Sequence, residues 1–580
     1  MRILNGIAAS GGISSGKALV FTHNSLEVSK DKIEPDKVDD ELLRFEQAVE
    51  KSVKETQQLL ESKSEETEKE IIETHVIMLQ DPEYHSEIKD AIKIHYQNAA
   101  WAVESVTASL IATLEASDIE MIRDRAVDMS DIARLIIENL LKKRSKKLNN
   151  IKEQVILVAD SLLPSEMLTL DKKYIKAIAV DTGGRTSHVA IFARSFGIPT
   201  VLGLYSASSK TRDGDEVILD GNQGQIVIRP EWYVKKSFDD IKKNWEKHQK
   251  ELLQVAKLPV VSPDKKKYVL KANIETPDEV ENALDKGASG IGLFRSEFIF
   301  LQKNGLLKEE VQFEIYKEVL EGMNGKPVTI RTIDIGGDKA LTSLGIDEEN
   351  PILGWRAIRF CLERKDIFRI QLRALLRASI YGKLHIMFPM ISGLDELEKT
   401  LLIFGQVKEE LRVNKIPFDK DIKIGTMIEV PSAALISDEL AKRVDFFSIG
   451  TNDLIQYTIA VDRGNEKIAH LYQPFHPGVL RLIKLVIDNA HKANIPIGMC
   501  GEMASNPYAT ILLAGLGLDE FSMSPSSLLE VRKILRTIDF SEAQKMTEEV
   551  LKMNSSSSIV AFIKKWMSER FEYLPKSHTL

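Results

Sequence analysis

The sequence predicts a multidomain α/β protein: an α/β domain interrupted by an all-α subdomain, followed by a (β/α)8 TIM barrel. The first observation is length, since 580 residues exceed what one hydrophobic core usually holds together. The second is a block of helical apolar spacing between segments with strand-like patterns. The third begins at residue 261, where eight short apolar segments alternate with helical stretches. That arithmetic is typical of an eightfold β/α barrel, whose active site lies at the C-terminal strand ends.

Composition narrows the class of protein before any motif is considered. Hydrophobic residues make up 43% of the chain and charged residues 28%, so the chain can bury substantial cores. The formal net charge of -8 argues against a nucleic-acid-binding surface. No apolar run approaches a membrane span, and the N-terminus lacks the apolar core of a secretory signal. Because the two cysteines, Cys361 and Cys500, lie far apart, we expect no disulfide framework and a reducing cytoplasm.

We predict that residues 1–22 and 149–230 form one compact α/β domain. Its expected strands are short apolar segments bounded by turn residues: Ala18–Phe21, Gln154–Asp160, Ala177–Asp181, Thr200–Leu202, Glu216–Asp220 and Gln225–Arg229. Residues 231–260, which are rich in lysine, predict a linker helix that would let this domain move.

Residues 23–148 predict a helical subdomain, because apolar side chains recur at helical spacing and no strand pattern interrupts them. The expected helical stretches end near residue 70 and then cover residues 71–79, about 100–117 and about 121–141. We interpret Asp81-Pro82 as the stop of the second stretch. The block contains no cluster of catalytic residue types, so it either docks a partner or is a structural insert.

The stretch from Gly183 to His188 lies between a predicted strand and an apolar helix expected at Val189–Phe196. Two glycines permit the turn, and the hydroxyl residues before His188 can cap the helix. His188 would then lie where free N–H groups and the helix dipole stabilise a phosphoryl group. Because an imidazole is a good nucleophile near neutral pH, phosphohistidine formation is one interpretation. A capped turn with a structural histidine explains the local sequence equally well.

Residues 261–580 predict the barrel domain. Its expected strands are Tyr268–Asn273, Gly290–Arg295, Val328–Asp334, Leu384–Met390, Ile422–Val430, Phe446–Gly450, Pro496–Glu502 and Asp519–Ser524. At or just after their C-terminal ends stand Asn273, Arg295, Arg331, Asp334, Met390, Glu429, Asn452, Asp453, Cys500 and Ser524. A chance set of strand ends would hold more Gly, Ser and Pro, so the sequence predicts a polar active site at this mouth of the barrel.

Arginines and carboxylates at these ends suggest phosphoryl chemistry. Four arginines offer planar forks for phosphate and carboxylate groups: Arg295, Arg331, Arg356 and Arg463. Glu429 and Asp453 come from adjacent strands, and two hard oxygen ligands that leave room for water and substrate suit Mg²⁺. Together these groups would clamp a transferring phosphoryl group. For any single pair, the alternative is a structural salt bridge at the barrel rim.

Cys500 ends a predicted strand within the segment Gly498–Glu502. We expect neighbouring cations to lower the pKa of its thiol, which could then donate or accept a proton. The alternative is a buried, apolar cysteine, which is our interpretation of Cys361 in the amphipathic helix after Trp355.

Several motifs carry a family resemblance: Gly183–Ile191, Gly292–Phe298, Thr329–Lys339, Leu353–Arg359, Met427–Ser432, Ser448–Leu454 and Gly498–Glu502. Over nearly its whole length, and in its domain order, the chain resembles enzyme I of the bacterial phosphoenolpyruvate:sugar phosphotransferase system.

The resemblance implies a role for each residue of interest. It implies that His188, on a swivelling phosphohistidine domain, takes phosphate from phosphoenolpyruvate and passes it to a histidine of the phosphocarrier protein HPr. Cys500 would protonate the enolate to give pyruvate, and Glu429 and Asp453 would hold Mg²⁺. The implied substrate-binding residues are Arg295, Arg331, Arg356, Asn452 and Arg463. Residues 23–148 match the HPr-docking subdomain, and the barrel matches the domain that binds phosphoenolpyruvate and forms the homodimer.

Two other functions stay open at this point. A phosphoenolpyruvate-utilising dikinase or synthase resembles the same modules, but it needs a large ATP-binding domain. Only about 150 mostly helical residues precede the predicted strand at Gln154, and they contain no Gly-x-x-x-x-Gly-Lys-Ser/Thr loop. A non-catalytic regulatory relay would keep the fold and would be expected to lose one of Glu429, Asp453, Cys500 or His188, yet all four are present.

Overall fold

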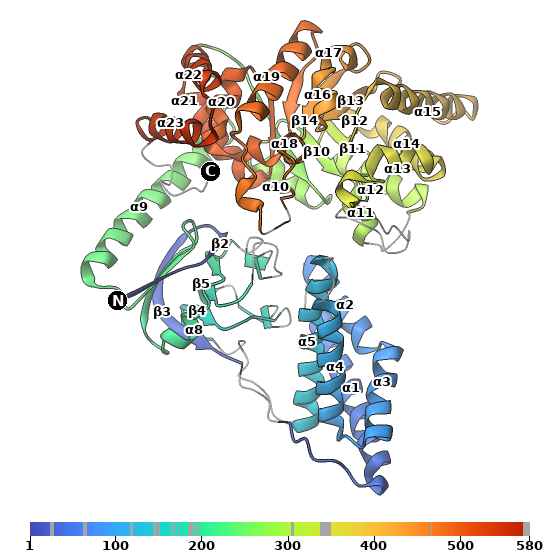
Figure 1. Cartoon of the computed structure of the whole chain (residues 1–580), viewed down its shortest axis with the longest axis vertical. Coiled ribbons are helices and arrows are strands. Elements are labelled where there is room, and N and C mark those ends of the chain that lie inside the picture. The colour runs from blue at the N-terminus through green and yellow to red at the C-terminus, as the bar shows by residue number, and fades with distance from the viewer. Residues whose placement is uncertain are drawn as a thin grey trace. The chain divides into compact units, whose positions relative to one another are not determined.

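The structure is a computed structural model of the chain (Figure 1). It describes all residues except 24–27, 62–65, 116–119, 143–147, 149–150, 164–165, 168, 172, 184–188, 191, 194–196, 303–306, 337–349, 464, 466 and 572–580. The chain divides into two compact units, Met1–Glu246 and Lys247–Leu580. Helix α9 (Trp232–Val255) carries the chain from the first unit into the second and corresponds to the predicted linker helix.

An eight-stranded sheet forms the α/β part of the first unit, in the order β1-β8-β7-β3-β4-β5-β6-β2. Its strands are β1 (Arg2–Asn5), β2 (Ile7–Ser10), β3 (Ile13–Phe21), β4 (Val155–Ala159), β5 (Ile175–Val180), β6 (Thr200–Leu202), β7 (Glu216–Asp220) and β8 (Gln225–Ile228), with a short helix α8 (Ala207–Lys210). Strands β3 to β6 are parallel, and antiparallel strands flank them.

Both faces of this sheet are buried, which explains the continuous apolar runs in its central strands. Along β4, Ile156 and Val158 pack into one cluster, while Leu157 and Ala159 pack into another. This split follows from the alternation of side chains along a strand. The six strands predicted for the domain are therefore confirmed, and β1 and β2 complete the sheet edges.

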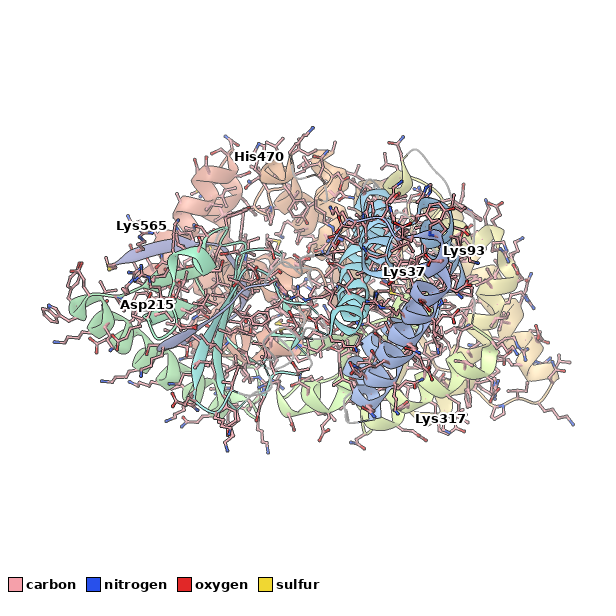
Figure 2. The ribbon with its side chains drawn as sticks, turned by 90° about the horizontal axis from the view of Figure 1, so that it is seen from below. Lys37, Lys93, Asp215, Lys317, His470 and Lys565 are labelled. Atoms are coloured by element: carbon pink, nitrogen blue, oxygen red, sulfur yellow. The ribbon has the colours of Figure 1, made fainter. Side chains whose placement is uncertain are left out.

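The helical part of the first unit contains α1 (Val38–Glu61), α2 (Glu66–Leu79), α3 (Pro82–His95), α4 (Ala99–Glu115) and α5 (Glu120–Leu141). Their facing stripes share one apolar core around Phe45, Ile88 and Ile132, while lysines such as Lys37 and Lys93 lie on the exposed surface (Figure 2).

Helix α3 is absent from the sequence prediction, which treated Asp81-Pro82 only as a stop. In the structure the same dipeptide also starts the next helix. The Asp81 carboxylate accepts hydrogen bonds from the N–H groups of Glu83 and Tyr84, at 2.8 and 3.0 Å. Pro82 takes the first helical position, where it needs no N–H donor.

The second unit is a closed parallel barrel with the strand order β9 to β16. Its strands are β9 (Val269–Ile274), β10 (Ile291–Arg295), β11 (Val328–Arg331), β12 (Leu384–Phe388), β13 (Lys423–Ile428), β14 (Phe446–Ile449), β15 (Ile497–Met499) and β16 (Glu520–Met523). Each predicted barrel segment overlaps one of these strands, so the (β/α)8 prediction is confirmed.

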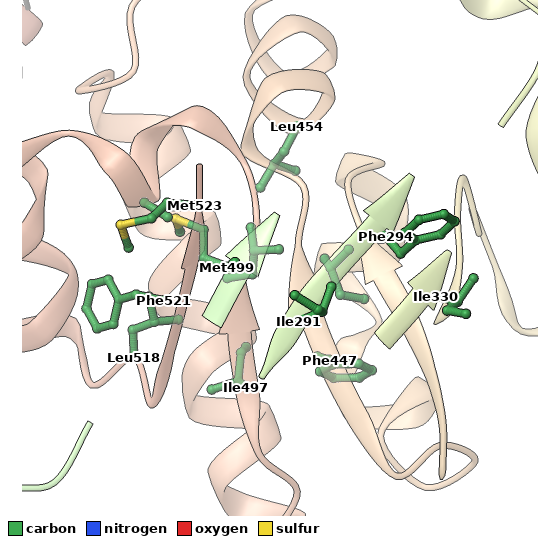
Figure 3. Packing of buried hydrophobic residues seen from close by; sticks show 14 of the residues in the cluster. Ile291, Phe294, Ile330, Phe447, Leu454, Ile497, Met499, Leu518, Phe521 and Met523 are labelled. Atoms are coloured by element: carbon green, nitrogen blue, oxygen red, sulfur yellow. The ribbon is translucent and has the colours of Figure 1, made fainter. Parts of the chain in front are cut away.

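Helices surround the barrel: α10 (Glu279–Asp285), α11 (Glu297–Gln302), α12 (Glu309–Gly322), α13 (Ala357–Glu363), α14 (Lys365–Ala378), α15 (Leu394–Val413), α16 (Pro431–Leu435), α17 (Ser437–Leu440), α18 (Thr451–Ile459), α19 (Pro477–Lys492), α20 (Pro507–Leu516), α21 (Leu528–Thr537), α22 (Phe540–Lys552) and α23 (Ser556–Ser568). Alternate strand residues such as Ile291, Ile330 and Phe447 belong to the large apolar core between strands and helices (Figure 3). None of the helices in the described part of the chain combines the length and hydropathy of a bilayer-spanning segment.

Candidate active site

The C-terminal ends of the barrel strands carry a buried network of arginines and carboxylates. Asp334, which follows β11, is at its centre because it accepts hydrogen bonds or ion pairs from two arginines. The network is formed by five residues that are each at most 6% exposed: Glu297, Arg331, Asp334, Arg356 and Glu429. Burial of so many charged side chains costs free energy unless they are paired. Packing alone therefore does not explain this network.

Arg331 is the last residue of β11, where strand alternation points it into the mouth of the barrel. Its Nη2 donates to a Glu297 oxygen, and its Nη1 lies 3.1 Å from Asp334 Oδ2. Burial would lower the pKa of Arg331, but Glu297 and Asp334 raise it further, so the guanidinium stays charged.

Arg356 immediately precedes α13 and also donates hydrogen bonds to Asp334. Its Nη2 donates to both Asp334 oxygens at 3.0 and 3.1 Å, and its Nε donates at 3.2 Å. Its Nη1 reaches the Tyr457 hydroxyl at 3.3 Å and Asp453 Oδ1 at 3.5 Å. Such forked contacts fix the plane of the guanidinium as well as its position. Gly336 permits this approach, since a Cβ there would lie 2.6 Å from Arg356 Cβ.

Glu429 follows β13 and accepts a hydrogen bond from the backbone just after the neighbouring strand β12. Its Oε1 accepts the N–H of Met390 at 2.6 Å, and Met390 adopts a left-handed φ of 58°. Burial, followed by the charges of Asp453 and Asp334, raises the pKa of Glu429 to about 8. Gly450 leaves space for the carboxylate, because a Cβ there would lie 2.8 Å from Glu429 Oε2.

A second, more exposed group lies just after the C-terminal ends of β14 and β15. Asn452 and Glu502 exchange two hydrogen bonds of 3.0 Å: the Asn452 amide donates to Glu502 Oε1, and the Glu502 N–H donates to Asn452 Oδ1. Arg463 Nη1 lies 3.7 Å from the same Glu502 oxygen. Arg295, at the end of β10, donates to Glu275 Oε1 at 2.7 Å. These pairs are partly open to solvent, so their side chains can exchange partners for a ligand.

Three family models match the chain in sequence order. Residues 5–125 match the N-terminal region of PEP-utilising enzymes, residues 151–224 their mobile domain, and residues 249–540 their PEP-binding domain. An NMR solution structure of an Enzyme I protein aligns over 42% of this chain and 99% of its own, with 35% identity and a TM-score of 0.37.

Curated relatives match the chain almost from end to end. A phosphoenolpyruvate-protein phosphotransferase of Bacillus sp. (strain S) is 43% identical, over 98% of this chain and 98% of the relative. One of Geobacillus stearothermophilus has the same identity and coverage. The chain belongs to the phosphoenolpyruvate-protein phosphotransferase family. The relatives carry the name implied by the resemblance, and neither is named a dikinase.

The pKa of the Cys500 thiol differs from the sequence prediction. Its backbone follows β15, and its side chain, 4% exposed, packs with Leu293, Met387 and Met427. Burial raises the pKa of the thiol, although Ser448 and Arg331 act in the opposite direction. The predicted lowering of the pKa is therefore wrong, because burial of the thiol outweighs the effect of the nearby arginines. Cys361 is also buried, as expected, and both cysteines are free.

Two carboxylates in the network fit a divalent cation. Within the described ranges, no cluster of three or more His, Cys, Asp or Glu side chains could hold a metal. Glu429 and Asp453 therefore supply two hard oxygen donors, the number with which Mg²⁺ is commonly held when substrate and water complete its shell. The raised pKa of Glu429 reflects burial beside Asp453. A cation would relieve that repulsion, so the donor set fits Mg²⁺.

His188 lies outside the described residues. Its flanks agree with the prediction, since Gly183 has a left-handed φ of 93° after β5 and Val189, Ala190, Phe192 and Ala193 are helical. Sequence reasoning placed Asp334 among the polar strand ends without giving it a chemical role, and it did not single out Glu297, Tyr457 or Glu502. Glu297 and Asp334 lie inside the quoted motifs, next to predicted arginines, which was the available signal.

Proposed function

We propose that this protein transfers the phosphoryl group of phosphoenolpyruvate to its own His188 and then to a histidine of HPr, releasing pyruvate. The observation that carries the proposal is the pair of arginines locked onto Asp334 beside Glu429 and Asp453. A site for one buried salt bridge needs neither the second arginine nor a further buried carboxylate, Glu429, near Asp453. A site for a dianion and a divalent cation needs both.

In this proposal the arginines bind and orient the substrate. Arg331 and Arg356 are pre-set by Asp334, so they lose little side-chain entropy when phosphate and carboxylate oxygens arrive. Arg295, Asn452 and Arg463 stand on the more exposed strand ends and loops, where they complete the binding of the ligand. Tyr457 and Glu297 hold the guanidinium planes of the two central arginines.

Cys500 is the proposed proton donor to the enolate carbon. A thiol with a raised pKa stays protonated near neutral pH, which a donor requires. Its surroundings of Leu293, Met387 and Met427 exclude water, so the proton is delivered from one fixed group. Glu429 and Asp453 would hold Mg²⁺, which when bound supplies positive charge to the phosphoryl oxygens.

The remaining parts of the proposal concern partners. The helical part of the first unit would dock HPr, and the mobile domain would carry His188 between the barrel and HPr. We also expect a cytoplasmic homodimer formed through the barrel. Large apolar side chains exposed on that unit, including Leu402 and Leu435, each 63% exposed, are consistent with a covered surface.

Phosphorylation from labelled phosphoenolpyruvate tests the proposal directly. With Mg²⁺, the protein should acquire an acid-labile label, pass it to purified HPr and release pyruvate. The variant His188→Ala should acquire none, whereas His470→Ala, which alters an exposed histidine, should label normally. Equal labelling of His188→Ala would refute the role of His188. Absence of any label would favour the non-catalytic relay, and labelling by ATP would favour the dikinase-like alternative.

A further inference from the structure

A second cavity lies inside the barrel, at the N-terminal ends of the strands. Its volume is about 460 Å³, and each of the eight strands contributes to its lining. The polar lining includes Lys271, Thr329, His385, Lys423, Ser448 and Glu520. Barrels of this class normally fill this region with layers of branched aliphatic side chains. A cavity with charged side chains in its lining needs an explanation.

Two glycines let side chains of neighbouring strands come close together inside the barrel. A Cβ at Gly292 would lie 2.2 Å from Ser522 Oγ, and a Cβ at Gly425 would lie 2.4 Å from the Phe446 ring. The glycines therefore let neighbouring polar and aromatic side chains cross the barrel interior where a branched residue would exclude them. The register supports one layer, since Thr329 pairs with His385 and His385 with Lys423 on successive strands.

Two ion pairs line the cavity, so it carries two positive and two negative side chains. Lys271, 5% exposed, places Nζ 2.5 Å from Glu520 Oε2. Lys423 Nζ lies 3.1 Å from Asp445 Oδ1, and these side chains are 56% and 40% exposed, so this pair marks the entrance. Lys271 is buried and Glu520 is 25% exposed, and an ion pair withdrawn from water is often no more stable than packed apolar residues of the same volume. Stability alone does not explain Lys271 and Glu520.

Thr329 and His385 add neutral polar groups to the lining. Among the described residues, neither the Thr329 hydroxyl nor the His385 ring nitrogens have a hydrogen-bond partner; the His385 ring lies 5.6 Å from that of Phe446. Burial, followed by the charge of Lys271, lowers the pKa of His385 to about 4. The neutral ring offers one N–H donor and one acceptor.

An apolar layer separates this cavity from the candidate active site. Leu293, Met387, Met427 and Cys500 form that layer, and each follows a cavity-lining strand position toward the C-terminal end. A ligand of the lower cavity therefore meets none of the arginines that we assign to phosphoenolpyruvate.

We propose that this cavity is a second binding site, for a small zwitterion of the α-amino-acid class. The ligand carboxylate would face Lys271 and Lys423, and its ammonium would face Glu520 and Asp445. Thr329 and His385 would supply the neutral hydrogen bonds. A simple anion would leave the two carboxylates of the site facing like charge, whereas a zwitterion matches both signs.

Calorimetry on the full chain tests this site, with glycine, L-alanine, L-serine and L-glutamate as probes and L-lactate and inorganic phosphate as comparisons. At least one amino acid should bind saturably, and added phosphoenolpyruvate should not displace it. Lys271→Met should weaken binding by at least about tenfold, and the near-isosteric Thr329→Val by about fivefold. Lys442→Met, on the surface beside Glu439, should change nothing.

Three outcomes would overturn the proposal: no saturable amino-acid binding, tighter binding of L-lactate or phosphate than of any amino acid, or displacement by phosphoenolpyruvate. Unchanged affinity in Thr329→Val would also overturn it. Because Thr329→Val keeps volume and charge, that variant decides the question even if Lys271→Met does not fold.

Discussion

The two ends of the same barrel both bury charge, but they use different side chains. At the C-terminal end, Arg331 and Arg356 present planar forks that share Asp334. At the N-terminal end, Lys271 meets Glu520 as a single ammonium–carboxylate contact, with no fork and no shared partner. One end fixes the orientation of its cations, and the other fixes only their position.

This difference teaches what each end can recognise. Fixed forks suit a ligand whose oxygens are planar or tetrahedral and strongly charged, such as a phosphoryl group. A point-like ammonium next to a carboxylate suits a small ligand with both signs of charge. The apolar layer that contains Cys500 keeps the two recognitions separate. Changes on either side of that layer should therefore have distinct effects.

The largest effect should come from removing the thiol in that layer. Cys500→Ala should lower pyruvate release by about 10²–10⁴-fold, because a positioned general acid contributes that much. A coupled assay of pyruvate checks the rate, and calorimetry with phosphoenolpyruvate checks that substrate binding persists.

Cys361→Ala is the matched control, since Cys361 is also a buried free thiol and lies within α13. It should leave turnover near that of the unaltered chain. Equal losses in both variants would mean that packing, and not proton donation, explains the effect at Cys500.

The sequence predicted the C-terminal end better than the N-terminal end, for a physical reason. Strand ends of a barrel converge, so polar residues after predicted strands had to meet, as Arg331, Arg356 and Glu429 do. Lys271 and Glu520 are 249 residues apart, and nothing local marks them as inward-facing partners. The direction of the Cys500 pKa shift was missed because it depends mainly on how deeply the thiol is buried, which the sequence does not show.

The next largest effect should come from breaking the Lys271–Glu520 ion pair at the N-terminal end of the barrel. Lys271→Met leaves the partly buried Glu520 without its cation, which should cost about 3 kcal/mol of unfolding free energy, the lower end for buried ion pairs because Glu520 keeps some contact with solvent. Urea unfolding of the barrel measures this. The double variant Lys271→Met, Glu520→Leu should recover most of the loss, since it removes both charges. A double variant as unstable as the single one would contradict the ion-pair explanation.

Acid should destabilise the N-terminal end of the barrel, because it protonates His385. Its folded-state pKa of about 4 lies below the ordinary value of 6.5. Between pH 4 and pH 6.5, His385 is therefore protonated in the unfolded chain but neutral in the folded chain. Unfolding free energy should therefore fall as pH drops from about 6.5 to 4, by about 3 kcal/mol. His385→Gln should lack this component. Parallel pH profiles of the two proteins would show that His385 does not titrate in this way.

The smallest effect compares one glycine at each end. Gly450→Ala brings a Cβ within 2.8 Å of Glu429 Oε2 and 2.9 Å of Met427 Sδ, while Gly498→Ala meets only Glu520 Cβ, at 3.3 Å. Glu429 cannot yield freely, because the Met390 N–H holds its other oxygen. Gly450→Ala should therefore cost about 1–3 kcal/mol and raise the Mg²⁺ concentration needed for turnover. Gly498→Ala should cost less than about 1 kcal/mol and leave the Mg²⁺ dependence unchanged; a shift in that dependence would show that the apolar layer does not isolate the two ends.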